Sequence, residues 1–291
     1  MENSYQRSIV TLTTDFGEAD SFVAQMKGIL LSVSRGPLAV ESLTQQISPF
    51  NTAGARRFLS QVARFYPDRT IHLAVIDPGV GSNRRGLIIR ARLDNPHTGA
   101  VSAYFVGPDN GIFSDFLNPE QLQGVWEIDM ESNVLACSCS GNELCRSFDG
   151  REVFAPVAAH LASGVSPDML GRKIAAEQLV CLPQIEEVIV DSVIDEVGLS
   201  AGVITAGDCY GNMETNYLVA KNGLKKIQDD FVLETLSGQQ LCYAESFFAV
   251  PPGDAAYHLG CNGYLEIFVN CGNAREQLNI KVGDEIRLLR K

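Results

Sequence analysis

Residues 75 to 86, VIDPGVGSNRRG, combine a carboxylate and two guanidinium groups around one glycine-rich turn. Asp77 precedes the turn, and Arg84 and Arg85 follow it. A turn alone explains Asp-Pro-Gly, because these residue types open and form turns. The segment matches neither glycine-rich phosphate-loop pattern, GxGxxG or a terminal Gly-Lys-Ser/Thr. Two interpretations stay open for this segment, a plain turn and a ligand site at the carboxyl end of a strand.

Other acidic side chains follow apolar segments in the same part of the chain. Asp15 lies in TLTTDFG, Asp109 and Asn110 lie in VGPDNG, and Asp149 precedes Gly150 in SFDGREVFAP. Each one alone is explained as a turn or helix-cap residue. Parallel strands bring their carboxyl ends to one edge of a sheet, so together these groups predict one site there. A strand-end carboxylate such as Asp15 suits a ribose diol, since it can accept from both hydroxyl groups.

The elements that position these residues alternate between strands and helices. The apolar spacing predicts strands and helices in turn, which favours βαβ units and a mainly parallel, Rossmann-like sheet in an N-terminal α/β domain, residues 1–183. The predicted strands are 8–16, 38–47, 70–77, 85–93, 102–111 and 124–129, and the predicted helices are 20–33, 51–66 and 151–164.

After Pro183 the pattern changes to short strands separated by Gly and Asn turns. This is typical of a smaller β-barrel-like domain, which we place at residues 187–291. In this domain DCYGNMETN offers Asp208 and Asn212, and GYLEIFVNCGNA offers Glu266, the Val269 backbone and Asn270. An amide side chain has both a donor and an acceptor, as the edge of a purine requires.

Composition narrows the classes of partner. The chain has 291 residues, 45% hydrophobic residues and a formal net charge of −12. Acidic chains lack the basic surface that nucleic acids and anionic membranes require, so a small-molecule ligand is favoured. No apolar run is long enough to cross a bilayer and the start lacks a signal peptide, which predicts a cytoplasmic protein.

Eight cysteines are spread irregularly over the second half of the chain. Such spacing in a long chain does not indicate a disulfide scaffold. The cluster CSCSGNELC, with Cys137, Cys139 and Cys145, lacks a CxxC pair and a nearby histidine, so it is a poor zinc site. We therefore expect reduced thiols and no metal.

The motifs taken together resemble the S-adenosylmethionine (SAM) hydroxide adenosyltransferase family, formerly the domain of unknown function DUF62, which includes SAM hydrolases, fluorinase and chlorinase. The resemblance covers essentially the whole chain and implies an α/β domain followed by a barrel-like domain, a homotrimer with ligand where subunits meet, and no cofactor besides the substrate SAM. The segments that carry it are, in order, TLTTDFGEADSFVAQMKG, VIDPGVGSNRR, FVGPDNG, SFDGREVFAPVAAHLASG, GDCYGNMETN and GYLEIFVNCGNA.

By this resemblance Asp77 and Arg84 belong to an Asp-Arg-His set that positions a water or hydroxide for attack on the ribose C5′, with Arg85 as an alternative to Arg84. The sulfonium leaves as a neutral thioether, so catalysis reduces to positioning and charge. The substrate-binding roles implied are ribose at Asp15, methionine at Asp20 and Asp208, adenosine at Asn212, Glu266 and Val269, and a weaker contact at Cys261, where the family usually has Ser.

Asp149 departs from the family pattern, because hydrolases have His at this position and halogenating members usually have Tyr. An Asp is a weak base at neutral pH unless its surroundings raise its pKa, and it repels a halide. We therefore expect a SAM hydrolase with catalytic residues Asp77, Arg84 and Asp149. The alternatives are a non-catalytic SAM or adenosine binder, in which loss of the His has left recognition without turnover, and a chlorinase-like enzyme that uses halide.

Overall fold

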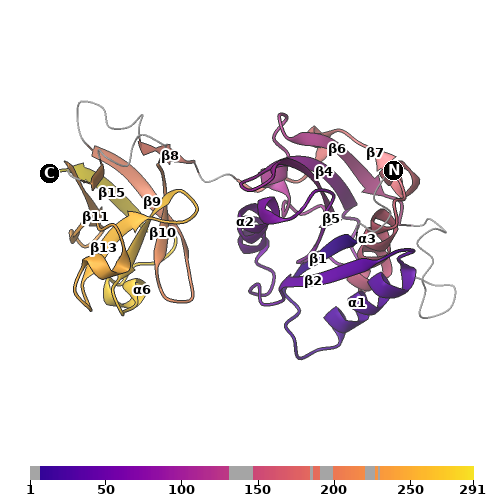
Figure 1. Ribbon diagram of the computed structural model, residues 1–291, viewed down its shortest axis with the longest axis horizontal. Coiled ribbons are helices and arrows are strands. Elements are labelled where there is room, and N and C mark those ends of the chain that lie inside the picture. The colour runs from indigo at the N-terminus through magenta and orange to yellow at the C-terminus, as the bar shows by residue number, and fades with distance from the viewer. Residues whose placement is uncertain (1–6, 131–146, 184–185, 191–198, 220–226, 229) are drawn as a thin grey trace. The chain divides into compact units, whose positions relative to one another are not determined.

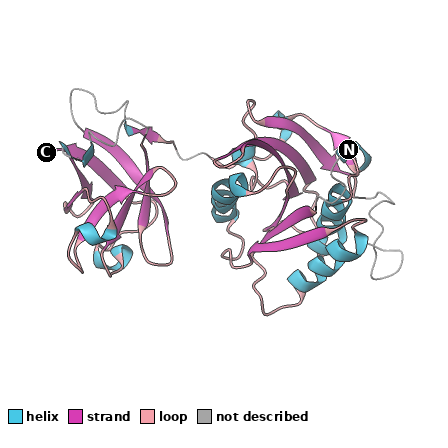
Figure 2. Cartoon of the chain, in the orientation of Figure 1, coloured by secondary structure: helices cyan, strands magenta, loops and turns pink. Residues whose placement is uncertain are grey.

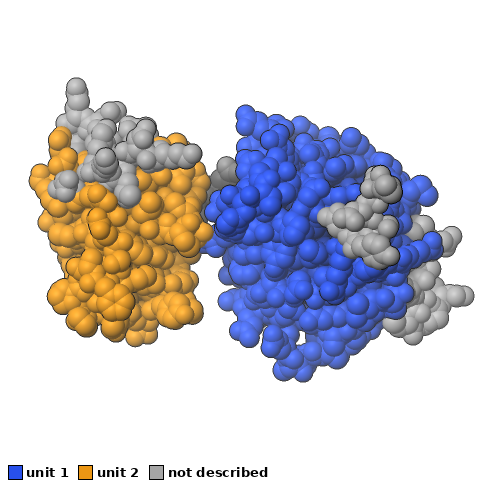
Figure 3. All heavy atoms as spheres, viewed as in Figure 1, with its two compact units in different colours: residues 1–182 blue, residues 183–291 orange. Residues whose placement is uncertain are grey.

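The computed structural model describes residues 7–130, 147–183, 186–190, 199–219, 227–228 and 230–291. The cysteine cluster at 137–145 lies outside these ranges. Internal contacts divide the chain into two compact units, residues 1–182 and 183–291, coloured separately in Figure 3. Each unit is described by itself below.

The first unit is built on one seven-stranded sheet (Figure 1). Its strands are β1 (Ser8–Thr14), β2 (Leu38–Thr44), β3 (Ile71–Val75), β4 (Gly86–Asn95), β5 (Gly99–Pro108), β6 (Leu122–Ile128) and β7 (Gly171–Lys173), in the spatial order β2-β1-β3-β5-β4-β6-β7. The pairs β2–β1, β1–β3 and β3–β5 are parallel. The pairs β5–β4, β4–β6 and β6–β7 are antiparallel.

The prediction of a mainly parallel sheet is therefore right for one half only. The short turn after Asn95 joins β4 to β5 as a hairpin, and a connection this short can only produce an antiparallel pair. The alternation of strand and helix that favoured parallel pairing ends at β3, so the antiparallel half begins where the helical connections stop.

Helices cover both faces of this sheet (Figures 1 and 2). Helices α1 (Phe22–Val33) and α3 (Ala155–Ala162) share one hydrophobic core with the sheet, through residues such as Met26, Leu30 and Val157. Helix α2 (Thr52–Val62) packs on the opposite face through Ala55 and Leu59. Short 3₁₀ turns complete the unit at Ala63–Phe65, Ser114–Phe116, Pro167–Met169 and Ala176–Gln178.

The helix predicted at residues 151–164 begins with a π-helical turn, η4 (Gly150–Phe154), and continues as α3 to Ala162. Asp149 is the residue before this turn, and its side chain makes no capping hydrogen bond. A π-turn is rare and is frequently found at functional sites.

Strands make up most of the regular secondary structure of the second unit (Figure 2). It contains β8 (Val188–Ile189), β9 (Leu199–Gly207), β10 (Met213–Leu218), β11 (Phe231–Thr235), β12 (Gln240–Cys242), β13 (Ala255–Leu259), β14 (Tyr264–Val269), β15 (Glu285–Arg290), helix α6 (Ala274–Gln277) and a 3₁₀ turn at Phe247–Ala249. The antiparallel order β12-β11-β15-β9-β10-β14-β13 is nearly closed, because a bridge joins Tyr243, after β12, to Tyr257 of β13. This agrees with the predicted barrel-like architecture.

Alternation along β14 shows why these residues form a barrel strand. Leu265, Ile267 and Val269 are buried in the core of the unit, whereas Glu266 between them is only partly buried. Side chains alternate between the two faces of a strand, so Leu265, Ile267 and Val269 fill the barrel. Glu266 lies on the other face, where Phe268 is buried in a small separate cluster.

His72 makes the first unit sensitive to acid. Its side chain is fully buried in β3, and burial lowers its pKa from 6.5 to about 3. Between these values the unfolded chain binds a proton that the folded chain does not, so stability is lost as pH falls below 6.5. We expect this histidine to lower the free energy of unfolding by about 2 kcal/mol at about pH 5 relative to neutral pH.

Urea unfolding followed by the fluorescence of Trp126, the single tryptophan and part of this sheet, measures the effect. His72→Gln should destabilise the unit at neutral pH but flatten the dependence on acid. The exposed His97 supplies the matched control, His97→Gln, which should leave the slope unchanged. An equal slope in wild type and His72→Gln would disprove this account.

Candidate active site

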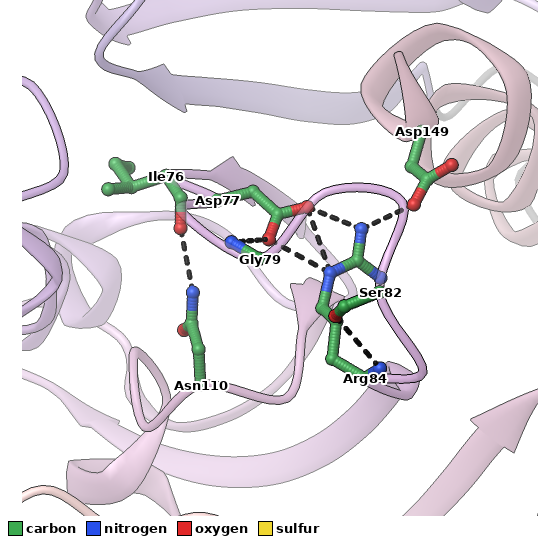
Figure 4. Close-up of polar contacts among 7 residues, drawn as sticks. All are labelled: Ile76, Asp77, Gly79, Ser82, Arg84, Asn110 and Asp149. Atoms are coloured by element: carbon green, nitrogen blue, oxygen red, sulfur yellow. Dashed lines mark hydrogen bonds and ion pairs between the residues drawn. The ribbon is translucent and has the colours of Figure 1, made fainter. Parts of the chain in front are cut away.

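Arg84 is the centre of a buried charged cluster in the first unit (Figure 4). Its Nε donates to both carboxylate oxygens of Asp77 at 2.9 Å, and its Nη2 donates to Asp77 and to Asp149. The Arg84 side chain is 9% exposed, and the two carboxylate side chains are each 6% exposed. One guanidinium thus bridges two carboxylates that lie 72 residues apart in the sequence, and the cluster has a formal charge of −1.

The loop between β3 and β4 holds Arg84 against Asp77. The N–H of Gly79 donates to Asp77 Oδ1 at 3.2 Å, and the N–H of Arg84 donates to Ser82 Oγ at 3.2 Å. Gly81 adopts φ +78°, which residues with a Cβ rarely reach, so glycine is required at that point of the turn. The Asp-Pro-Gly segment therefore does form a turn, and this turn also brings the Arg84 guanidinium back to Asp77.

Two features of Arg84 point to chemistry beyond an ion pair. Its guanidinium lies over the ring of Phe154, 5.1 Å from the centroid, which favours a cation there. Its Nη1 is buried and has no hydrogen-bond partner among the described residues. A buried donor without an acceptor is unfavourable, and a bound water or ligand oxygen would relieve it.

Arg85 and Asp109 form a separate pair and do not join this cluster. Arg85 Nε donates to Asp109 Oδ2 at 2.8 Å, and the buried Asp109 also accepts from the N–H of Val180 at 3.0 Å. Asn110 donates to the Ile76 carbonyl at 2.8 Å. Asp109, Asn110 and Arg85 therefore tie loops together at this edge, and Asp77 is paired with Arg84 and not with Arg85.

Asp15 and Asp20 lie in the segment that follows β1. Strand β1 is the neighbour of β3 in the sheet. Asp15 Oδ2 accepts from the N–H of Phe50 at 2.9 Å, whereas Asp20 is exposed in the turn before α1. Phe50, which was not predicted as a partner of Asp15, has φ +64° and is 70% exposed. A single Phe in SPFNTAG gives no signal for that conformation.

In the second unit, Asp208 and Asn212 form one polar turn between β9 and β10. Asp208 accepts from the N–H groups of Tyr210 and Asn212 and from the Asn212 amide, each at 2.9 Å. Asn212 leads into β10, which pairs with the part of β14 near Val269. The side chain of Val269 is in the core, so only its backbone is available for recognition.

Glu266 and Cys261 lie on the hairpin that β13 and β14 form, Glu266 in β14 and Cys261 in the turn between the two strands. Glu266 pairs with His258 Nε2 at 2.8 Å, a partner that the sequence analysis missed because it comes from the neighbouring strand. Cys261 is exposed in the turn before β14, at the opposite end of that strand from Val269. The structure therefore brings Asp208 and Asn212 together but separates Cys261 from them.

A cavity of about 620 Å³ adjoins Arg84 and Asp149 in the first unit. Within the described residues, no group of three or more His, Cys, Asp or Glu side chains is arranged to hold a metal ion. In the same residues no helix is long and apolar enough to cross a membrane. The chemistry that the cluster itself offers is two carboxylates and a guanidinium, which orient and polarise a small polar molecule.

Each of the two units matches the model of a known protein domain. Residues 10–171 match the model of the SAM hydroxide adenosyltransferase N-terminal domain, and residues 202–287 match that of the C-terminal domain. An (R)-S-adenosyl-L-methionine hydrolase of Thermus thermophilus is 34% identical over 96% of this chain and 99% of its own length. A hydrolase of the same name from Salinispora arenicola is 30% identical over 96% and 97%.

More distant matches are a fluorinase and a solved structure. A fluorinase of Actinopolyspora mzabensis is 24% identical over the full length of both chains. The crystal structure of an uncharacterized conserved protein from Thermotoga maritima superposes with a TM-score of 0.79, at 27% identity, over 97% of this chain and all of that one.

Proposed function

The chain belongs to the SAM hydroxide adenosyltransferase family, and we propose that it hydrolyses S-adenosyl-L-methionine to adenosine and L-methionine. The observation that carries this proposal is the buried Arg84 bridge between Asp77 and Asp149. The hydrolases are also closer in sequence than the fluorinase.

In this reaction the oxygen of a water forms a bond to the ribose C5′ while the C5′–sulfur bond breaks. Sulfur keeps the electron pair and leaves as the thioether of methionine, and one proton of the water must be accepted. Asp77 accepts hydrogen bonds from the N–H of Gly79 and from Nε and Nη2 of Arg84, which fix the position of its carboxylate, so we assign it to orienting the water. Asp149 is then the base, and Arg84 stabilises the hydroxide-like nucleophile.

The substrate contacts follow from the family pattern. Asp15 would hold the ribose hydroxyls, with its carboxylate oriented by the N–H of Phe50. Asp20 and Asp208 would contact methionine. We assign adenosine to Asn212, Glu266 and the Val269 backbone. Cys261, which also matches the family pattern, lies at the opposite end of β14 from Val269 and is left out of this set. We further propose a cytoplasmic homotrimer that binds SAM where subunits meet, which sedimentation would test against the chain mass of 31.6 kDa.

The charge of the cluster argues against a halide as the nucleophile. Two carboxylates share one guanidinium, so an anion placed beside Arg84 meets a net negative charge in a buried site. Purified protein is incubated with SAM, with and without sodium chloride, and products are identified by chromatography and mass detection. Adenosine and methionine in both buffers are expected. Formation of 5′-chloro-5′-deoxyadenosine would identify a halogenase, and tight binding of unchanged SAM would identify a binder.

We expect the enzyme to prefer one configuration at the sulfonium. The names of the two hydrolase relatives specify the (R) form. In-line attack fixes the C5′–sulfur bond opposite the water, so inverting sulfur exchanges the methyl group and the methionine chain. Misplacing a substrate in this way lowers rates by about 10²-fold. Separate assays of the resolved (R) and (S) epimers measure the ratio, and equal rates would contradict fixation of the methionine chain.

A further inference from the structure

The cavity beside Arg84, which we call the Arg84 cavity, has walls from three segments. They are the loop 81–86, the end of β6 with residues 127–130, and residues 168–172 around the start of β7. Asp149 contributes to the walls as well. Asp77 is not among the described residues that line the cavity. The two carboxylates that share Arg84 therefore differ, because only Asp149 borders this space.

The order of the strands places the Arg84 cavity relative to Asp15. Asp15 follows β1 and Asp77 follows β3, whereas the cavity is formed at β4, β6 and β7. In the sheet these elements run β1-β3-β5-β4-β6-β7. The cavity thus lies on the side of the Arg84 cluster that is remote from Asp15.

This inference rests on the proposed hydrolysis, whose chemistry requires a source of water and an outlet for a proton on the side of Arg84 remote from Asp15. Displacement at C5′ is in line, so the water and the departing sulfur occupy opposite sides of the carbon. Each turnover consumes one water and releases one proton, because the substrate is a cation and both products are neutral overall. With the ribose near Asp15, the nucleophile must be supplied and its proton removed without passing the bound substrate.

We propose that the Arg84 cavity is the water supply and proton exit of the reaction. A water from the cavity moves to Arg84, its oxygen bonds to C5′ as sulfur leaves with the C–S electron pair, and its proton passes to Asp149. Asp149 then returns that proton to cavity water and is ready for the next turnover. This assigns separate tasks to the two carboxylates, orientation to Asp77 and proton transfer to Asp149.

The walls suit this task. Besides Asp149 they carry the carboxylates of Glu127, Asp129 and Asp168, and the guanidinium groups of Arg84, Arg85 and Arg172. Asp168 accepts from Trp126 Nε1 at 2.7 Å, and this bond lowers its pKa. Arg172, which is 78% exposed, donates to Glu127 at 2.8 Å. An excess of carboxylates draws a released proton outward.

Narrowing the cavity tests the proposal. Met169 and Asn83 line it from two different segments, and both are exposed, so Met169→Trp and Asn83→Trp add bulk without opening the core. Leu31→Trp is the matched control, because Leu31 is 61% exposed on α1 and is not a lining residue. The assay supplies methanol as a second nucleophile, which converts SAM to 5′-O-methyladenosine and methionine. The ratio of ether to adenosine does not depend on the amount of folded enzyme.

We expect wild type and Leu31→Trp to give the same ratio, and both wall variants to lower it about tenfold while the dissociation constant for SAM stays within twofold. An unchanged ratio in both wall variants, or an active wild type that forms no ether, overturns the cavity assignment. Absence of adenosine from wild type is a different result, because it overturns the proposed hydrolysis itself.

Discussion

Replacing Arg84 by glutamine should lower kcat for SAM hydrolysis by about 10²- to 10³-fold, the usual effect of removing one preorganised donor from a charged transition state. Arg84 contacts both proposed catalytic carboxylates, so the substitution removes the charge that favours a hydroxide-like nucleophile and the group that holds Asp77 and Asp149 together. Binding of SAM should change much less, since no substrate-binding role is assigned to Arg84.

The same substitution should destabilise the fold. It leaves two carboxylates, each with a side chain 6% exposed, without their shared cation, and breaking a buried pair in this way costs about 3–5 kcal/mol. The fluorescence of Trp126 during urea unfolding measures the loss. The control is Arg287→Gln, the same change at a half-exposed arginine paired with Glu285, where about 0–1 kcal/mol is expected.

A double variant separates stability from catalysis. Arg84→Gln combined with Asp149→Asn removes one of the two stranded charges, so stability should recover partly while kcat remains low. Arg84→Lys keeps the charge but not the planar fork that bridges two carboxylates, and it should fall between wild type and Arg84→Gln in both measurements. If Arg84→Gln retained the wild-type rate, the cluster would be structural and the proposed mechanism wrong.

The Asp77–Arg84 pair could be predicted from the sequence because both residues lie within one short turn, where the chain itself limits their separation. The sequence could not show whether Arg84 or Arg85 is the partner of Asp77. The two side chains just before β4 point in different directions, and Arg84 pairs with Asp77 whereas Arg85 pairs with Asp109. Which of the two arginines pairs with Asp77 and which with Asp109 depends on packing between segments that are distant in the sequence.

Asp149 illustrates a different limit. Its approach to Arg84 joins residues that are 65 positions apart and depends on a π-helical turn, which no periodicity in SFDGREVFAP indicates. The resemblance to the family predicted that Asp149 joins Asp77 and Arg84. The residues around Asp149, taken by themselves, predicted only a turn or a helix cap. The sheet shows a related limit. The short turn after Asn95 fixes β4 and β5 as an antiparallel pair, but apolar alternation does not show that β6 pairs with β4.

Asp149→Asn is expected to lower kcat by about 10²- to 10⁴-fold, the range associated with loss of a general base. The amide has the same shape as the carboxylate and its oxygen can still accept from Arg84 Nη2, but it cannot take up a proton. The Michaelis constant should therefore change little. An asparagine variant with the wild-type rate would show that the proton goes elsewhere, with Asp77 as the candidate acceptor.

The pH profile distinguishes a base from a residue that only supports Arg84. A base works in its unprotonated form, and histidine is a weaker acid than a carboxyl group. Asp149→His, which introduces the residue that hydrolases of the family have here, should therefore lose activity at higher pH than wild type does as the solution is acidified. A purely structural role for Asp149 would leave that acid limb in place. A large gain in rate for Asp149→His across the whole pH range would instead show that the native aspartate limits turnover, as expected of a chain selected for binding SAM rather than for splitting it.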